Sequence, residues 1–170
     1  HGNHVDGLGL TYGTGLLTTI EPRAVAAYTF APSWPTLAKG FTRADLVLGN
    51  GRRVVMVAVH LDFASADVRH DQVTELIEAC ADVDAPLVVM GDFNCALQAE
   101  GSPLPRLTEA LNLHTWEPTA EDLVTFPSRQ VRIDYIFAST TLTFLSHAVG
   151  ADAVSDHRAV TAQLRVPPAP

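Results

Sequence analysis

Positive charge, cysteine and long apolar runs are all scarce in this chain of 170 residues. It carries 11 lysines and arginines against 19 aspartates and glutamates, a formal net charge of −8. Electrostatic capture of duplex nucleic acid needs clustered lysine and arginine, so this balance argues against that class of binding. A local phosphate site in which acidic residues hold a metal ion is still compatible with it. Two cysteines, Cys80 and Cys95, cannot form a disulfide framework and are typical of a reducing, cytoplasmic compartment.

The longest apolar run, from Val54 to Val59, has the length of a buried strand and falls far short of the roughly 20 residues that span a bilayer. No basic segment followed by an apolar stretch indicates a secretory signal. Glycines are frequent in the first fifteen residues, but no Gly-Lys-Ser/Thr follows, so we interpret this segment as an irregular loop. A nucleotide-binding Rossmann domain is set aside because no glycine fingerprint is properly placed.

Apolar residues make up 47% of the chain and charged residues 18%, as in globular proteins, and we expect one domain over residues 1–166 with a proline-rich tail at 167–170. The hydropathy pattern predicts strands at 16–20, 25–30, 41–48, 54–59, 87–90, 131–137, 141–149 and 158–166. Helices are expected at 67–82, where apolar residues recur with helical spacing, and at 105–111. Because hairpins occur together with strand–helix alternation, the sequence predicts an α/β sandwich with mixed sheets.

Side chains with useful chemistry gather at the ends of the predicted strands. Asp92 and Asn94 follow a buried strand two residues apart, which directs both side chains to one side of an extended backbone. The carboxylate can bind a metal or orient a water, and the amide can donate to a phosphoryl oxygen. A simple turn after the strand is the alternative interpretation, because Asp and Asn are common in turns.

Asp134 lies in an otherwise apolar strand, where an unpaired carboxylate would be costly to bury. An imidazole is a natural partner, since a carboxylate that holds a histidine in one tautomer is half of a catalytic dyad. The adjacent residues Asp156 and His157 have suitable chemistry, because histidine transfers protons near neutral pH and aspartate is a hard ligand for Mg²⁺. The alternatives are an exposed strand face for Asp134 and an incidental surface loop for the pair.

His60 ends the apolar strand that precedes Asp62. A histidine at that place is commonly a hydrogen-bonding residue of the core, and Asp62 can equally supply polarity at the start of the next helix. Neither residue predicts a function by itself.

Several motifs follow one another along the chain: Gly13-Thr14-Gly15-Leu16-Leu17-Thr18, Lys39-Gly40-Phe41 with Arg43, His60-Leu61-Asp62 with Arg69 and Gln72, Gly91-Asp92-Phe93-Asn94, Thr125-Phe126-Pro127 with Arg132-Ile133-Asp134-Tyr135-Ile136, and Ser155-Asp156-His157. Their order and spacing resemble the endonuclease/exonuclease/phosphatase superfamily of metal-dependent phosphoesterases. The resemblance covers the chain from Gly13 to Val166. It implies the deoxyribonuclease-like fold, a four-layer α/β sandwich with two mixed sheets.

The resemblance also implies a role for each matching residue. Asp92 would activate or orient the attacking water, Asn94 would bind the phosphate, and His60 would contact the phosphate from the other side. Arg43 is a further candidate for substrate contact, as is Lys39, although a solvent-facing position is the expected one for both.

The remaining motif residues would complete the reaction centre. His157 would stabilise charge in the transition state or transfer a proton, and Asp134 would orient it. Asp156 and Asp92 would hold a divalent metal, Mg²⁺ or alternatively Mn²⁺.

Two motifs of the superfamily have no counterpart here. Its first strands normally end in Trp-Asn and Gln-Glu, whose glutamate is the main metal ligand, and no glutamate precedes Glu21. We therefore expect a chain that lacks the first strands of the fold. Two functions stay open: an Mg²⁺-dependent phosphoester hydrolase of phosphodiesterase, nuclease or phosphatase type, or a catalytically incomplete fragment or pseudoenzyme that binds phosphate. The substrate would be a nucleic acid, a phospholipid headgroup ester or a small phosphate ester, and no feature predicts a protein partner.

Overall fold

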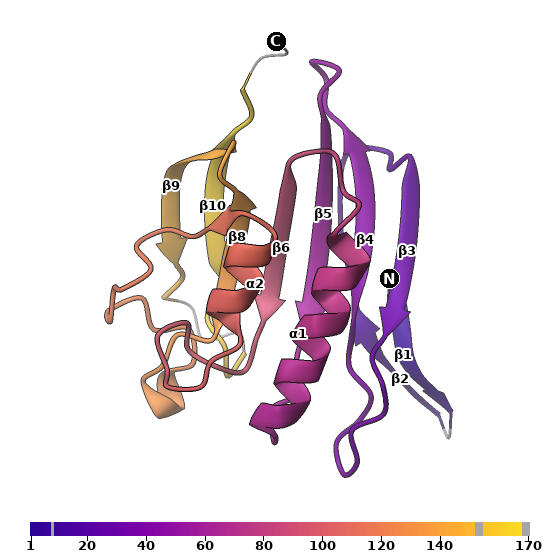
Figure 1. Cartoon of the computed structure of the whole chain (residues 1–170), viewed down its shortest axis with the longest axis vertical. Helices are drawn as coiled ribbons and strands as arrows, with labels where there is room; N and C mark the ends of the chain where they lie inside the picture. Colours follow the sequence, from indigo (N-terminus) through magenta and orange to yellow (C-terminus); the bar gives the residue numbers. More distant parts are fainter. Residues whose placement is uncertain (8, 152–154, 168–170) are drawn as a thin grey trace.

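The computed structural model describes residues 1–7, 9–151 and 155–167, and its centre is a six-stranded mixed sheet (Figure 1). The strands lie in the order β3 (Ala24–Thr29), β4 (Gly40–Val47), β5 (Arg53–His60), β6 (Leu87–Asp92), β8 (Asp134–Ser139) and β7 (Leu113–His114). β5 and β6 are parallel, whereas the other pairs in this sheet are antiparallel. Consequently β5 and β6 end, and β8 begins, at the same edge of the sheet.

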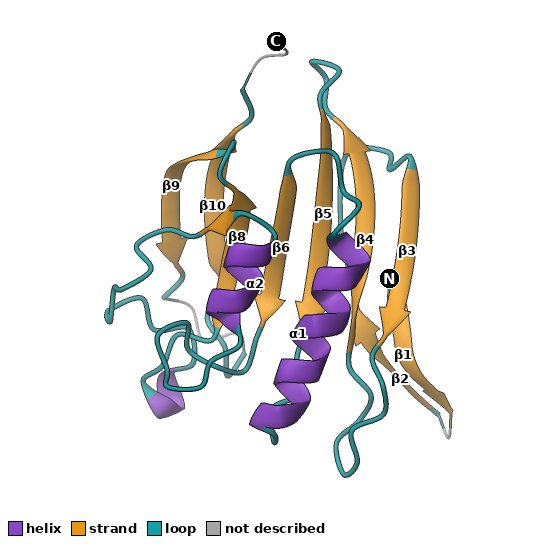
Figure 2. Cartoon of the chain, viewed as in Figure 1, coloured by secondary structure: helices purple, strands orange, loops and turns teal. Residues whose placement is uncertain are grey.

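Two helices, α1 (Ala66–Cys80) and α2 (Leu104–Ala110), cover one face of this sheet (Figure 2). α1 begins after Ser65, whose side chain accepts a hydrogen bond from the N–H of Val68 as an N-cap. Its apolar stripe, including the buried Val73 and Leu76, belongs to one core with Val57 of the sheet. Both predicted helices are confirmed, with small shifts of their ends.

The opposite face is covered by two antiparallel hairpins, β1 (Gly2–Gly7) with β2 (Leu10–Thr14), and β9 (Thr143–Val149) with β10 (Val160–Arg165). β1 contacts β3 and β4, and β2 contacts β4 and β5. The second hairpin closes a smaller core in which Val88, Ile136 and Leu142 are buried. An α/β sandwich is therefore confirmed, with one mixed sheet and two antiparallel hairpins in the described residues where the resemblance implied two mixed sheets. In the described residues its layers are the helices, the central sheet and the hairpins.

The structure corrects two expectations for the N-terminal segment. The first fifteen residues are not an irregular loop, because β1 and β2 pair there. Conversely, residues 16–20 form no strand, and Leu17 is fully exposed. A two-residue period explains the first error: Gly2 and His4 are buried beside the exposed Asn3, a pattern that frequent glycines concealed.

The strand expected at 131–137 begins only at Asp134, because the preceding residues turn aside. Val131 forms an isolated bridge with Phe126, and the buried Arg132 donates to the carbonyl oxygen of Trp116. The short strand β7 was not predicted, and the other predicted strands occur with changed ends. None of the described helices combines the length and hydropathy needed to cross a membrane. The predicted proline-rich tail lies outside the described residues from position 168 onward.

Candidate active site

Three polar side chains form a row at one edge of the central sheet. His60 ends β5, Asp92 ends β6 and Asp134 begins β8, and the register pairs His60 with Asp92 and Asp92 with Asp134. Paired residues share a face of a sheet, so the three side chains point to the face opposite α1 and α2. The topology thus brings together groups that are far apart in the sequence.

The backbone after β6 adopts a shape that these particular residues allow. Gly91 has a φ of 145°, and a Cβ there would lie 1.9 Å from the carbonyl oxygen of Val59, so glycine is required between β5 and β6. Asn94 has a left-handed φ of 52°, which asparagine tolerates. Its N–H donates to Asp92 Oδ1 at 2.9 Å, and its Nδ2 donates to Asp92 Oδ2 at 3.1 Å and to the Leu61 carbonyl at 3.0 Å. This turn fixes the Asp92 carboxylate at the sheet edge.

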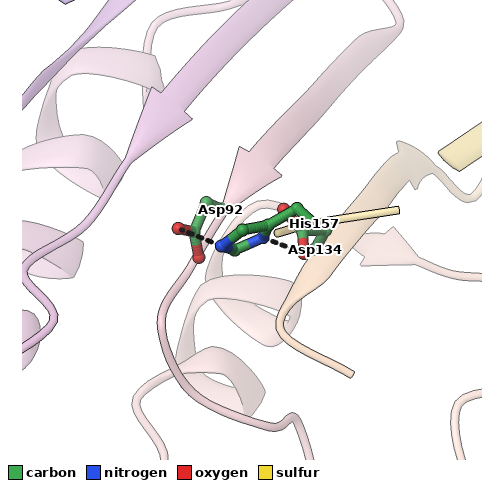
Figure 3. Close-up of side chains that lie close together, drawn as sticks. All are labelled: Asp92, Asp134 and His157. Carbon is green, nitrogen blue, oxygen red and sulfur yellow. Dashed lines mark hydrogen bonds and ion pairs between the residues drawn. The ribbon is translucent and has the colours of Figure 1, made fainter. Parts of the chain in front are cut away.

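His157 reaches the row from the segment between β9 and β10 and pairs with Asp134 (Figure 3). Its Nδ1 lies 2.9 Å from Asp134 Oδ2, and its Nε2 lies 3.9 Å from Asp92 Oδ2. An ionised carboxylate only accepts hydrogen bonds, so Nδ1 carries the donated hydrogen and Asp134 sets the orientation of the ring. The structure therefore contains the carboxylate–imidazole pair that the motifs suggested.

Burial and charge act differently on the members of this cluster. Burial is the main reason that the pKa of Asp92 rises to about 6; the N–H of Asn94 offsets part of the rise, and the charge of Asp134 adds to it. Burial alone would lower the pKa of His157. The hydrogen bond and charge of Asp134, together with the charges of Asp92 and Asp156, outweigh burial and raise that pKa. The cluster therefore favours a positively charged His157 beside Asp92.

His60 lies on the other side of Asp92, with its Nε2 3.5 Å from Asp92 Oδ2. Its Nδ1 lies 2.8 Å from the hydroxyl oxygen of Tyr12 in β2. Burial, followed by the charges of Lys39 and His157, lowers the pKa of His60 to about 4. At neutral pH His60 is therefore a neutral imidazole, in contrast to His157.

The segment after His60 is braced by motif residues of α1. Gln72 Oε1 accepts from the Asp62 N–H at 2.7 Å, and Arg69 Nη1 donates to the Asp62 carbonyl at 3.0 Å. The buried carboxylate of Asp62 accepts two N–H groups of the following loop at 2.8 and 2.9 Å. Asp62 thus acts at the start of the helix, which is the structural alternative that its position in the sequence suggested.

The Thr-Phe-Pro motif holds both members of the Asp134–His157 pair. The hydroxyl oxygen of Thr125 accepts from two N–H groups at the start of β8, at 3.0 and 3.1 Å. Its carbonyl oxygen accepts from the N–H of Arg158 at 2.8 Å. The ring of Phe126 packs against the ring of His157, with centroids 4.7 Å apart. One turn therefore positions the carboxylate and the imidazole together.

The row opens into a cavity of about 750 Å³ that combines polar, apolar and aromatic side chains. Its lining residues are His60, Phe63, Asp92, Asn94, Cys95, Ala96, Ala99, Phe126, Arg129, Val131, Ile133, Asp134, Asp156 and His157. Phe63 follows β5 and is 62% exposed, whereas Phe126 stands beside His157. Burial raises the pKa of the Cys95 thiol, which argues against a thiolate nucleophile in this cavity.

Two residues occupy places other than those expected. Arg43 does not line the cavity: it pairs in register with the helix-facing Val57, and its Nη1 donates to the Ala79 carbonyl at 3.0 Å, near the end of α1. The prediction of substrate contact for Arg43 is therefore wrong, because the alternation along β4 turns its side chain to the helix face. Lys39 does not face solvent; it is 3% exposed, and its Nζ lies 4.9 Å from the centroid of the Tyr12 ring.

Three site residues were not anticipated from the sequence. Tyr12 lies in a segment that was interpreted as a loop, so its contact with His60 had no local signal. Phe63 lines the cavity from a loop, and Arg129 lines it from a short 3-10 helix at Pro127–Arg129. Only Phe63 had a usable signal, because it directly follows the His60-Leu61-Asp62 motif.

The cluster can hold a divalent cation. Among the described residues, Asp92, Asp134 and His157 each offer a ligand atom within 4.8 Å of the others. The pKa of Asp92, raised by burial and by the charge of Asp134, indicates negative charge without a fixed counter-ion. Asp156 lines the same cavity from an exposed position and offers another carboxylate. Such oxygen donors suit Mg²⁺ and Mn²⁺.

An α/β sandwich with mixed sheets that carries an Asp–His pair at its strand ends is typical of the deoxyribonuclease-like class of proteins. The chain matches the profile of the Endonuclease/Exonuclease/phosphatase family over residues 3–157, and it belongs to that family. Members of this family are typically hydrolases that act on phosphoesters and generally depend on a divalent metal. The family resemblance read from the motifs is thereby confirmed.

The chain is also similar to several known proteins. The chain is 25% identical over 163 residues to UPF0294 proteins of Vibrio cholerae, covering 95% of its own length and 57% of theirs. It thus spans little more than half of these curated relatives. An endonuclease/exonuclease/phosphatase family protein from Leptotrichia buccalis superposes with a TM-score of 0.74 at 20% identity, over 97% of this chain and 70% of that one. A mannosyl-6-phosphatase from Bacteroides thetaiotaomicron gives a TM-score of 0.67 at 15% identity, over 86% and 67%. Likeness to these two structures establishes the fold alone.

Proposed function

We propose that this chain carries the active centre of a phosphodiester hydrolase that works with a divalent cation, Mg²⁺ or in its place Mn²⁺. The observation that carries the proposal is the row of His60, Asp92 and Asp134, with His157 bonded to Asp134 at 2.9 Å, inside one cavity. The Asp92 carboxylate can orient a water molecule or bind a metal ion. It lies between the oriented imidazole of His157 and the neutral imidazole of His60. Carboxylates and imidazoles of this kind can support phosphoester hydrolysis assisted by a metal ion.

The cation would be held by Asp92 and Asp156, because both carboxylates line the cavity and Asp134 is already engaged by His157. Held by these two carboxylates, a divalent cation would supply positive charge that neutralises the phosphoryl oxygens. Mg²⁺ commonly takes only one or two protein carboxylates and keeps water ligands, so this small donor set suits it.

His157 supplies a proton or a positive charge at the reacting phosphate. Asp134 accepts the hydrogen of Nδ1, which leaves Nε2 directed toward Asp92 and the cavity. Burial opposes protonation of His157, but the hydrogen bond and charge of Asp134 outweigh burial and raise the pKa, which favours a proton on Nε2. That proton can stabilise a phosphoryl oxygen or pass to the leaving oxygen.

Asp92 orients the attacking water when its carboxyl group is ionised. Its pKa of about 6 means that this form predominates at higher pH. Asn94 holds this carboxylate, since its amide hydrogens are directed to Asp92 and to the carbonyl of Leu61. In this conformation Asn94 positions Asp92. Contact of Asn94 with the phosphate, as the family resemblance implies, requires one of these hydrogens to turn toward the substrate.

The walls of the cavity favour a phosphodiester over a phosphomonoester. Two aromatic rings line the cavity with Asp92: Phe63, which follows β5, and Phe126, which packs against the His157 ring. Arg129 lines the Phe126 side, with its guanidinium 5.9 Å from that ring. Aromatic faces stack on flat or apolar groups, so each of the two ester groups of a diester could pack against one of these rings. A phosphate ester with two planar arms, such as a short single-stranded nucleic acid, fits this arrangement best.

Hydrolysis of bis(p-nitrophenyl) phosphate tests the proposal. We expect turnover in Mg²⁺ or Mn²⁺ that chelator abolishes and that falls by about 100-fold or more in His157→Ala. His70→Ala is the matched control, because His70 lies on α1 outside the cavity and should leave turnover unchanged. A folded wild-type chain that binds phosphate without turnover would contradict the enzyme and favour a phosphate-binding module.

The preference for diesters has its own test. With p-nitrophenyl phosphate as the monoester, we expect kcat/KM to be about 10-fold lower than with the diester, since a single ester group packs against only one of the two aromatic rings. Phe126→Ala should reduce the efficiency toward the diester more than toward the monoester. Equal efficiencies would contradict the preference for diesters, and a higher efficiency toward the monoester would indicate a phosphatase.

A further inference from the structure

The β1–β2 hairpin places one side chain directly against the active-site row. The hydroxyl oxygen of Tyr12 lies 2.8 Å from Nδ1 of His60, and the two ring centroids are 6.0 Å apart at an interplanar angle of 52°. No step of the proposed reaction uses Tyr12. Because a phenol hydroxyl can either donate or accept, the tautomer of His60 follows from the groups on both sides of its ring.

The other side of the imidazole shows where that hydrogen lies. His60 Nε2 is 3.5 Å from Asp92 Oδ2, longer than an ordinary hydrogen bond but close enough for electrostatic attraction. A carboxylate only accepts, so a hydrogen on Nε2 is attracted to it, whereas a bare lone pair would be repelled. When the neutral ring carries its hydrogen on Nε2, Nδ1 is an acceptor and the Tyr12 hydroxyl must be the donor.

The surroundings of Tyr12 suit a donor that does not move. Burial, together with the negative charge of Asp92, raises the pKa of the phenol, so the hydroxyl keeps its hydrogen. Lys39 Nζ lies 4.9 Å from the centroid of the Tyr12 ring. The hairpin itself is tied to β4, because the hydroxyl oxygens of Thr14 and Thr42 lie 2.9 Å apart.

We infer that Tyr12 is a positioning residue that fixes His60 in the tautomer with its hydrogen on Nε2. His60 thereby presents a donor to Asp92 and, in the reaction proposed above, to a phosphoryl oxygen. The catalytic part of this inference rests on the proposed function, whereas the tautomer does not. Without the phenol, Nδ1 is free to carry the hydrogen, and Nε2 then loses the ability to hold an anionic oxygen.

Nitrogen-15 NMR of the imidazole rings in the whole chain, at neutral pH and without metal, tests the tautomer. Correlations from the ring C–H protons distinguish the two neutral tautomers, and His60→Gln assigns the signals of His60. We expect the Nε2–H tautomer in the wild type and a mixture in Tyr12→Phe, which removes only the hydroxyl group. Tyr28→Phe in β3, where Tyr28 stacks on Phe41, is the matched control and should leave the His60 signals unchanged.

Hydrolysis of bis(p-nitrophenyl) phosphate provides the second readout. We expect kcat to fall about 10-fold in Tyr12→Phe with KM little changed, because the lost donor acts on the transition state. A wild type with the hydrogen on Nδ1, or a Tyr12→Phe variant that keeps the wild-type tautomer, overturns the inference. A shifted tautomer with unchanged kcat overturns its catalytic part.

The two proposals can fail separately. A wild type without turnover contradicts the proposed function, while the NMR result still decides the role of Tyr12. If Tyr12→Phe does not fold, the tautomer of the wild type alone decides, since only a hydroxyl that donates is compatible with Nε2–H.

Discussion

At the scale of single residues, the carboxylates of this site differ because their surroundings differ. Asp92 is buried with little compensation beyond Asn94, so its pKa rises to about 6. Burial would raise the pKa of Asp62 as well, but hydrogen bonds from Thr36 and from nearby backbone N–H groups outweigh burial and lower it. One carboxylate oxygen of Asp134 accepts the hydrogen bond from His157. One residue type therefore supplies a reactive group, a structural brace and a partner for an imidazole.

The Asp134–His157 pair gives the first prediction. Asp134→Asn removes the charge that favours protonated His157, so the pKa of His157 should fall and kcat/KM toward bis(p-nitrophenyl) phosphate should drop by about 100-fold. Steady-state kinetics and the pH profile check both effects. A folded variant with a normal melting temperature and wild-type kinetics would show that Asp134 does not orient the imidazole.

Asp62 gives a prediction for stability against pH. Its pKa in the folded chain lies below the ordinary value of 3.8, so its ionised form stabilises the fold above about pH 4, and this contribution is lost as the pH falls further. Asp62→Asn should therefore cost about 2 kcal/mol in free energy of unfolding at neutral pH. Urea titrations of both chains should show the difference shrinking below about pH 4. A difference that stays constant with pH would mean that the charge of Asp62 contributes nothing.

At the scale of elements, the site depends on how β5, β6 and β8 align. The register sets His60, Asp92 and Asp134 side by side, and close approach of β5 to β6 makes this possible. Gly91 is the residue that permits the approach, because its backbone conformation and the nearby Val59 carbonyl leave no room for a side chain.

Gly91→Ala should separate these strands. We expect a loss of about 3 kcal/mol in the free energy of unfolding, because the new Cβ meets backbone and the φ of 145° is strained for alanine. Gly49→Ala is the matched control, since a Cβ at Gly49 meets nothing within 4 Å. Chemical denaturation measures both variants. Equal stability of the two would contradict the steric argument.

Arg43 gives the opposite kind of prediction. Its guanidinium donates to the Ala79 carbonyl near the end of α1, so Arg43→Ala should cost about 1 kcal/mol of stability. Hydrolysis should be unchanged, because the side chain lies on the helix face of β4. Unchanged stability together with reduced hydrolysis would show that Arg43 contacts the substrate after all.

At the scale of the whole molecule, the features predicted correctly from the sequence are those that a short segment specifies by itself. The apolar stripe of α1 and the buried runs of β5 and β6 are local, and so are the polar residues that end those strands. A carboxylate in an apolar strand needs a partner, but the family resemblance, and no local pattern, implied that the partner of Asp134 is His157.

Features that depend on pairing between distant segments could not be predicted in this way. The hairpin of β1 and β2 is rich in glycine, so its two-residue period was hidden, and the contact of Tyr12 with His60 was hidden with it. Arg43 and Lys39 were placed in solvent because cations usually lie there. Only the register of β4 against β5 shows that Arg43 faces α1, and the buried Lys39 lies against the Tyr12 ring of the hairpin and the Phe63 ring.

The proposed active centre is tested most directly by comparing Asp92→Asn, His157→Ala and Arg43→Ala for the hydrolysis of bis(p-nitrophenyl) phosphate in Mg²⁺. We predict that kcat/KM falls by about 100-fold or more in the first two variants and stays at the wild-type value in Arg43→Ala. Equal activity in all three folded variants would contradict the assignment of the strand-end row as the reaction centre.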